Sequence, residues 1–506
     1  MKRLISCLLL LAASIAAAAE TPPKPKLVVV IVADQFRQDY LTRFRDDYKA
    51  GLDRLLRNGA VFTHAYHEHF PTVTAIGHSA ILTGAFPSVS GIVGNDWYDR
   101  ETGKQVTSVS DLQVSPVGGG EVGASPHRLL VNTVGDEMKL ATAGKARVIG
   151  MSMKDRAAIL PAGHLADAAY WYDGSTGRFV TSSYYRAELP DWVKDFNSKA
   201  AGQYKGMEWL GRKMPESQKV FSALLGSPFG NDLLEAFAEQ AIRNEKLGQG
   251  PVTDLLSISF SSNDYVGHQF GPDSPQVRDI SIRTDQVIGK LFQFLDAEIG
   301  MQNVLVIFTG DHGVAPMPDG QAGKRIPGGR MPTGIIQTNV QNELTRRYGE
   351  GNWILSPSEH SLYLNRGLIQ KKNLALAEVE QAAKEAVSAI PHVFRAYTGE
   401  QLTNKASWQD LVGRRVLNGH NLSRGADVYV LLDPYWMFGA AGTTHGSAFN
   451  YDAHVPVVFM GAGVRPGKYD QNVATVDIAP TLATLLEVDP PSGSAGRALT
   501  EALVPR

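Results

Sequence analysis

Six aspartate and histidine residues, spread over most of this 506-residue chain, have the clearest chemical potential. Carboxylate oxygens and neutral imidazole nitrogens are suitable zinc ligands. Six of them suffice for two ions with three protein ligands each, which leaves one position per ion for a nucleophile, water or substrate. The six residues are Asp34, Asp264, His268, Asp311, His312 and His445. Such a set predicts a two-metal centre for phosphoryl transfer.

Local spacing indicates how these side chains could reach an ion. Asp311 and His312 are adjacent in a turn bracketed by glycines, which let the backbone bend sharply. Asp264 and His268 are four residues apart and would project from one face of a helix. His445 also lies in a glycine-bracketed turn. Each residue alone has an ordinary alternative, such as a helix cap, a turn residue or a packed histidine, and only the joint pattern favours a metal centre.

Thr74 lies between the first two clusters, in a segment of small and polar residues where a nucleophile could sit. A threonine hydroxyl is a poor nucleophile near neutral pH unless a base or a metal ion favours its alkoxide. Residues 73–82 read as a turn into a helix, and a helix start directs backbone N–H groups at an incoming phosphate. Without the metal ligands, Thr74 would be an ordinary loop or capping hydroxyl.

Each acid-bearing cluster stands at or just after the end of an apolar, β-branched run typical of a buried strand. These runs are residues 27–33, 254–260 and 304–308, with further candidates at 147–151, 427–432 and 455–460. Helical patterns intervene, notably at 231–244, 276–300 and 374–390. The alternation predicts an α/β fold with a mainly parallel central sheet flanked by helices. Because ligands bind at the carboxyl ends of the strands in such sheets, the acids fall on the functional edge.

The expected organisation is one large domain behind a secretion signal. Residues 1–19 combine a charged start, an apolar run and a small-residue end, which is typical of a signal peptide and predicts a secreted protein of the bacterial periplasm. Residues 20–506 then form a single domain, with insertions at about 155–219 and 318–425 that cap the sheet edge. No apolar run of membrane-spanning length follows the signal.

Composition excludes several classes of chemistry. Cys7 is the only cysteine and lies within the predicted signal peptide, so the mature chain has no disulfide, cysteine nucleophile or cysteine zinc site. The net charge of −2 gives no sign of a nucleic-acid partner. A secreted phosphate- or zinc-binding protein without turnover is disfavoured because a binder needs no nucleophile such as Thr74. The strand–helix alternation gives no support to a carbohydrate or adhesion module.

The segment around Thr74 resembles the nucleophile segment of the alkaline phosphatase superfamily, which nucleotide pyrophosphatase/phosphodiesterases share with threonine-type alkaline phosphatases. It reads Phe70-Pro71-Thr72-Val73-Thr74, followed by Gly77-His78, Leu82-Thr83-Gly84, Pro87 and Gly91. The resemblance extends from Asp34 to the C-terminal segment 477–482. It implies one zinc on Asp264, His268 and His445, and a second on Asp34, Asp311 and His312, with Thr74 bound to the second as alkoxide. It also implies that Asn95 contacts a phosphoryl oxygen.

The tripeptide Lys154-Asp155-Arg156 favours one subgroup. It resembles the Lys-x-Arg pair of the threonine-type phosphomonoesterases, which the diesterases lack. A monoester dianion carries one more charge than a diester, and Lys and Arg would bind the extra oxygen. The alternative for such a pair is a solvated surface position. Gly77 also departs from the asparagine usual at that position in the diesterases.

We therefore expect a secreted alkaline phosphatase that hydrolyses small-molecule phosphate monoesters through a phosphothreonine intermediate at a two-zinc site. The alternative is a phosphodiesterase or nucleotide pyrophosphatase of the same superfamily. Manganese, iron or calcium would suit the carboxylate-rich ligand set nearly as well as zinc. The physiological ester is left open, and a monomer is the simplest expectation for the assembly.

Overall fold

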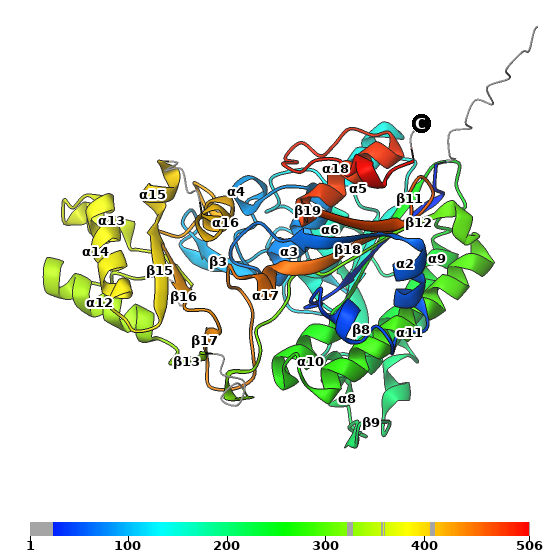
Figure 1. Cartoon of the computed structure of the whole chain (residues 1–506), viewed down its shortest axis with the longest axis horizontal. Coiled ribbons are helices and arrows are strands. Elements are labelled where there is room, and N and C mark those ends of the chain that lie inside the picture. The colour runs from blue at the N-terminus through cyan, green and yellow to red at the C-terminus, as the bar shows by residue number, and fades with distance from the viewer. Residues whose placement is uncertain (1–23, 321–326, 356–357, 359, 405–409, 505–506) are drawn as a thin grey trace, which may run out of the picture.

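A single large sheet runs through the middle of the protein (Figure 1). The computed structural model describes residues 24–320, 327–355, 358, 360–404 and 410–504, so the predicted signal peptide lies outside the described residues. Ten strands form the sheet in this order: β19 (Gly467–Ala474), β2 (Ala60–Tyr66), β18 (His454–Gly461), β12 (Val304–Thr309), β1 (Leu27–Ala33), β11 (Asp254–Phe260), β6 (Val148–Ser152), β7 (Ala168–Asp173), β8 (Arg178–Ser182) and β5 (Pro116–Val117). The five strands from β12 to β7 are mutually parallel, and β18 and β8 run antiparallel at either side of them.

Alternate side chains of the central strand β1 enter two different hydrophobic cores. Leu27, Val29 and Ile31 pack on one face of the sheet, and Val28 and Val30 on the other. The first face is covered by α2 (Gly51–Asn58), α9 (Pro228–Asn244) and α11 (Pro275–Glu298). The second is covered by α3 (Thr74–Thr83), α5 (Val134–Ala141) and α18 (Ile478–Leu486). Because both faces of β1 are buried, polar and apolar residues do not alternate along it, which explains its continuous β-branched sequence.

The predicted α/β fold with a mainly parallel sheet is confirmed, and the limits of the predicted strands agree within a residue. The run at 427–432 forms a strand as predicted but does not join the main sheet. It forms β16 (Val428–Leu432), which lies outside the main sheet, between β14 (Ser361–Leu362) and β15 (Val393–Thr398). The run is apolar because β16 is buried in a second core of its own.

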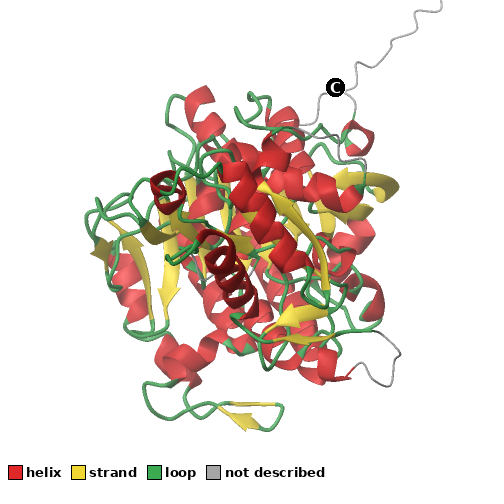
Figure 2. Ribbon diagram, turned by 90° about the vertical axis from the view of Figure 1, so that its left-hand side faces the viewer, coloured by secondary structure: helices red, strands yellow, loops and turns green. Residues whose placement is uncertain are grey.

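Much of the region 318–425 folds into a lobe at one end of the sheet, at the left of Figure 1 and facing the viewer in Figure 2. Its small sheet packs against α12 (Ile335–Tyr348) and α14 (Leu376–Ser388), with α13 (Arg366–Lys371) alongside. Trp353 is fully buried in this core. The lobe returns to the main body through β17 (Trp436–Phe438), which pairs with β13 (Gly329–Met331).

The region 155–219 is divided between the sheet and its periphery. It supplies α6 (Asp155–Ala162) and the sheet strands β7 and β8, so its first half belongs to the main body. Only the later part leaves the sheet, as α7 (Asp191–Asn197) and the short hairpin of β9 (Glu208–Trp209) and β10 (Arg212–Lys213), which projects at the bottom of Figures 1 and 2. Among the described residues, no helix combines the length and hydropathy needed to cross a bilayer.

A buried carboxylate holds helix α2 onto helix α11. Asp285 of α11 accepts hydrogen bonds from the main-chain nitrogens of Lys49, Ala50 and Leu52 at 2.7–2.9 Å. The first turn of a helix leaves its N–H groups without partners inside the helix, and α2 has no capping side chain of its own. Asp285 therefore serves as a cap supplied from another helix, and its negative charge is favourable at the positive end of the helix dipole.

We predict that Asp285→Ala lowers the free energy of unfolding by about 2–4 kcal/mol, because several buried N–H groups lose their charged acceptor together. Urea unfolding followed by circular dichroism would measure the change. The control is Gln286→Ala, at the exposed neighbouring position of the same helix. Equal stability of the two variants would contradict the capping role.

Candidate active site

All six predicted metal ligands come together at the carboxyl edge of the parallel strands. Asp34 directly follows β1, and Asp311 and His312 follow β12. Asp264 and His268 lie on α10 (Ser262–Phe270), which begins as soon as β11 has ended. The sixth, His445, arrives from the loop that precedes α17 (Asn450–Ala453).

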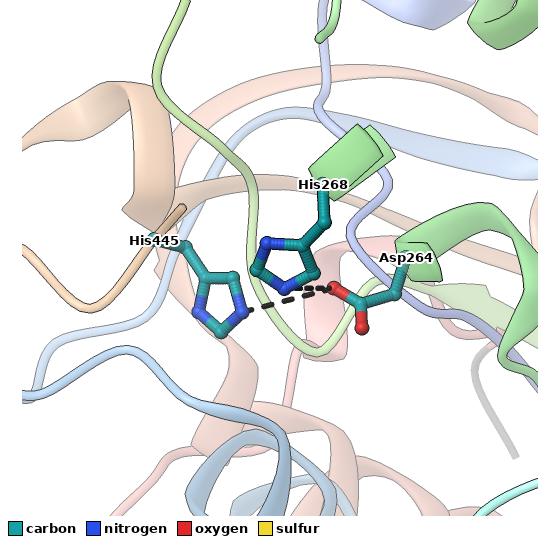
Figure 3. A group of neighbouring side chains, drawn as sticks. All are labelled: Asp264, His268 and His445. Atoms are coloured by element: carbon teal, nitrogen blue, oxygen red, sulfur yellow. Dashed lines mark ion pairs between the residues drawn. The ribbon is translucent and has the colours of Figure 1, made fainter. Parts of the chain in front are cut away.

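The first group of ligands contains Asp264, His268 and His445 (Figure 3). Nε2 of His268 lies 3.2 Å from Oδ1 of Asp264, and Nε2 of His445 lies 3.7 Å from the same oxygen. Two hydrogen bonds between His268 and Thr443 hold the His445 loop against α10. Three ligand atoms from two distant segments thus converge on one point.

A second group contains Asp34, Asp264 and His312, whose ligand atoms lie within 4.8 Å of one another. Asp264 therefore takes part in both groups. Asp311 lies beside them, with its Oδ2 3.3 Å from Nε2 of His312, and that Nε2 is 3.6 Å from Oδ1 of Asp34. The two groups therefore form one continuous cluster with Asp264 at its centre.

The three histidines are oriented as metal ligands. Nδ1 of His268 lies 2.7 Å from the carbonyl oxygen of Thr443. Nδ1 of His445 lies 2.8 Å from the carbonyl oxygen of Thr72, and Nδ1 of His312 lies 2.9 Å from that of Gly313. A carbonyl can only accept, so Nδ1 carries a proton in each ring, and Nε2 is the nitrogen turned toward the cluster, where it could bind a metal ion. Burial also lowers the pKa of His445 well below its usual range, which keeps that ring neutral. Such backbone partners fix the tautomer of metal-bound histidines.

The buried negative charge of the cluster favours the binding of a cation. Three carboxylates are buried here, and neither Oδ1 of Asp34 nor Oδ2 of Asp311 accepts a hydrogen bond from the described residues. Burial and the neighbouring carboxylate of Asp311 raise the pKa of Asp34 well above its usual range. Buried carboxylates of this kind are normally paired or bound to a metal. The donor set and the uncompensated oxygens fit divalent cations.

Thr74 is the first residue of α3 and is buried beside the cluster. Its Oγ1 lies 3.4 Å from Nε2 of His312 and 3.5 Å from Nζ of Lys154. The main-chain nitrogen of the next residue, Ala75, donates to Oδ1 of Asn95 at 2.9 Å, which places Asn95 beside the hydroxyl. The hydroxyl thus combines a helix N-terminus, a cation and an amide donor, an arrangement that suits a phosphoryl group.

Lys154 is not at the surface. Its ammonium group is buried and lies 2.6 Å from both Oδ2 of Asp34 and Oδ2 of Asp264, and it holds the pKa of Asp264 well below the usual range despite burial. Arg156, in the first turn of α6, is half-buried, and its Nε has no hydrogen-bond partner among the described residues. The alternative of a solvated surface pair therefore does not hold for Lys154.

Gln35 is a further site residue that sequence patterns did not single out. Its backbone nitrogen donates to Oδ1 of Asp311 at 3.0 Å, and its side-chain amide donates to Oδ1 of Asp264 at 2.6 Å. Its φ is +61°, a conformation rare for residues other than glycine. Oε1 packs so closely on Gly267 that a side chain there would collide with it. The residue that follows the strand-end Asp34 thereby links two of the carboxylates, a role that no local sequence signal marks.

His78 and Gly77 on α3 also contact the cluster. His78 lies with Nδ1 3.2 Å from Oδ2 of Asp311 while also bonding the carbonyl of Thr74. A side chain at Gly77 would collide with the backbone of Asp311. Glycine at this position thus lets the helix that begins at Thr74 pack directly on the Asp311 turn. The sequence marks Gly77-His78 as part of the family motif but does not indicate these contacts.

Comparison with known proteins agrees with this geometry. One relative is alkaline phosphatase PafA of Elizabethkingia meningoseptica, which is 36% identical over 94% of this chain and 93% of the relative. Another is a protein of Myroides odoratus named calcium-transporting ATPase, which is 37% identical over 94% of each chain. Alkaline phosphatase PhoV of Synechococcus elongatus is 36% identical, with 94% of this chain and 92% of the relative covered.

Solved structures give the same result. The crystal structure of PafA superposes with a TM-score of 0.89 over 95% of this chain and 99% of that one, at 36% identity. Another PafA structure, with a TM-score of 0.88, carries substitutions of a threonine, an asparagine, a lysine and an arginine. Residues 28–452 match the family described as type I phosphodiesterase / nucleotide pyrophosphatase. The chain belongs to this family, within the alkaline phosphatase superfamily.

Proposed function

We propose that the protein is a metal-dependent alkaline phosphatase that hydrolyses phosphate monoesters through a phosphothreonine formed on Thr74. The observation that carries the proposal is the placement of Thr74 Oγ1 at the start of α3, 3.4 Å from His312 and 3.5 Å from Lys154. The similarity to PafA and PhoV over nearly the whole chain supports the same activity.

Two zinc ions are the proposed cofactors. Asp264, His268 and His445 would hold one ion, and Asp34, Asp311 and His312 the other, with Asp264 close enough to contribute to both. When bound, the ions would supply Lewis-acid stabilisation of the attacking and departing oxygens. Ligand type leaves manganese, iron or calcium as alternatives at either position.

The chain's own residues carry out the transfer. Oγ1 of Thr74 attacks phosphorus, the bond from phosphorus to the ester oxygen breaks, and the alcohol departs with a proton. Water then attacks phosphorus, the bond from phosphorus to Oγ1 breaks, inorganic phosphate is released and the threonine hydroxyl is restored. The Lys154 ammonium favours the threonine alkoxide by its charge, and the positive end of the α3 helix dipole, where Thr74 lies, favours the phosphoryl anion. Asn95 would donate its amide N–H to one of these oxygens.

A phosphodiesterase is the second candidate, because the matched family is described by that activity. Lys154 and Arg156 favour the monoesterase. Cationic groups beside Thr74 stabilise the dianion of a monoester more than the monoanion of a diester. We further propose that residues 1–19 are a signal peptide that directs a single domain, residues 20–506, to the bacterial periplasm.

The substrate class can be tested by measuring kcat/KM of the zinc-loaded protein on p-nitrophenyl phosphate and bis-p-nitrophenyl phosphate. We expect a preference for the monoester by orders of magnitude. Arg156→Ala should reduce monoester hydrolysis about 10- to 100-fold, the value of one or two charged hydrogen bonds, and affect the diester less. Arg178→Ala, an exposed arginine of β8, is the control. A wild-type preference for the diester would establish the second candidate instead.

Thr74→Ala should abolish covalent phosphorylation and lower kcat by about 10³-fold or more, while zinc stays bound. Intact-mass spectrometry after acid quenching detects the phosphoenzyme, and elemental analysis measures the zinc. Thr74→Ser keeps a hydroxyl at the same position and should still form the intermediate. Phosphoenzyme in the alanine variant would rule out Thr74 as the nucleophile.

Gln35→Gly should weaken zinc binding about 10- to 100-fold, because the amide that orients Asp264 is lost. Glycine tolerates a φ of +61°, so the backbone contact to Asp311 and the local conformation are retained. Zinc remaining after dialysis against metal buffers is the readout, independent of activity. If zinc retention matches that of the Gln286→Ala control, Gln35 has no role in positioning the ligands.

A further inference from the structure

A pocket of about 470 Å³ lies beside the candidate active site, between α10, the β9–β10 hairpin and α8 (Val220–Leu225). Trp209, Arg212 and Lys213 line it from the hairpin, Leu225 from α8, and Tyr265 and Gln269 from α10. We call this space the hairpin pocket. None of its lining residues belongs to the metal-ligand cluster.

The hairpin pocket and the ligand cluster share helix α10. Asp264 and His268 are four residues apart on this helix, and Tyr265 and Gln269 occupy the positions immediately after them. The Tyr265 ring lies 5.3 Å from Nζ of Lys154, which is itself 3.5 Å from Oγ1 of Thr74. Tyr265 therefore adjoins both the candidate active site and the hairpin pocket.

The geometry of the proposed reaction indicates that the leaving group of the substrate would lie on the α10 side of the site. In an in-line displacement the leaving group departs on the side of phosphorus opposite the nucleophile. Oγ1 of Thr74 lies next to His312, so the proposed nucleophile is at the His312 end of the cluster. The opposite end is formed by His268 of α10 and by His445, with Asp264 between the two ends. Because His268 and Tyr265 belong to the same helix, a leaving group larger than a few atoms would reach α10 and the pocket that this helix lines.

The charge of the hairpin pocket favours an anion. Lys213 pairs with Glu216 at 2.8 Å. Arg212 is exposed, its guanidinium stacks on the Phe270 ring at 4.8 Å, and no carboxylate of the described residues forms an ion pair with it. A guanidinium over an aromatic ring can still present its N–H groups to a carboxylate or phosphate. The remaining lining mixes aromatic and apolar side chains, such as Trp209 and Leu225, with uncharged polar ones, such as Gln269, and carries no carboxylate among its described residues.

We propose that the hairpin pocket is a leaving-group subsite that selects phosphate monoesters whose alcohol part carries a second anionic group, a carboxylate or another phosphate. Arg212 binds the second anion, and Tyr265 contacts the part of the leaving group nearest phosphorus. This subsite rests on the proposed phosphatase function and specifies the substrate class of the same site. It takes no part in breaking the phosphorus–oxygen bond.

The test compares phenyl phosphate with 4-(carboxymethyl)phenyl phosphate, whose methylene keeps the leaving-group pKa close to that of phenol. The readout is the ratio of the two kcat/KM values, carboxylated over plain. We expect a ratio above one in the wild type, a fall of about 3- to 10-fold in Arg212→Ala, and recovery in Arg212→Lys, as for a partly exposed charge pair. Added salt should also lower the wild-type ratio.

The control is Lys205→Ala, which removes one exposed positive charge just before the hairpin and should leave the ratio unchanged. Because Arg212 is exposed, its substitution should not impair folding. A ratio that is the same in wild type, Arg212→Ala and Lys205→Ala overturns the subsite while leaving the phosphatase activity standing. No hydrolysis of either ester by the wild type overturns the proposed function and the subsite with it.

Discussion

The constraint on which the rest of this structure depends is the crowding of three buried carboxylates, Asp34, Asp264 and Asp311, at one edge of the sheet. Like charges in a buried place repel each other and lose the stabilisation of water. One ammonium, that of Lys154, pairs with two of the three. The excess negative charge makes the edge a strong site for divalent cations, and most features of the surrounding structure can be understood as holding these oxygens in place.

The fold supplies that support through the topology of the sheet. Because β12, β1 and β11 are adjacent and parallel, their carboxyl ends deliver the three acids side by side. Gln35, in its left-handed conformation, ties two of them together, and Gly77 lets α3 approach the Asp311 turn. The nucleophile proposed at Thr74 thus begins a helix that is packed directly on the metal-ligand turn, which limits its freedom to move away from the reacting phosphorus.

Selectivity in this arrangement would come from elements outside the sheet. The candidate active site is formed by the ends of strands and the segments that directly follow them. The β9–β10 hairpin instead approaches α10 from the periphery, on the helix face next to Asp264 and His268. A short peripheral segment can change without disturbing the sheet, so a subsite built there would separate the choice of ester from the chemistry of its cleavage.

The sequence by itself determined the fold class and picked out the residues that gather at the sheet edge. Strands buried on both faces leave continuous β-branched runs, and glycine-bracketed Asp-His patterns are visible without coordinates. Tertiary structure alone decided which runs share a sheet. The run at 427–432 has the composition of a central strand but is buried in the smaller lobe. A hydrophobic run indicates that a strand is buried and does not indicate which strands pair with it. The tertiary structure also decided that Asp264 lies between the two ligand groups and that Lys154 is buried against two carboxylates. It placed Gln35 and Tyr265 next to the site. These depend on contacts between residues far apart in the chain, which spacing along one segment cannot encode.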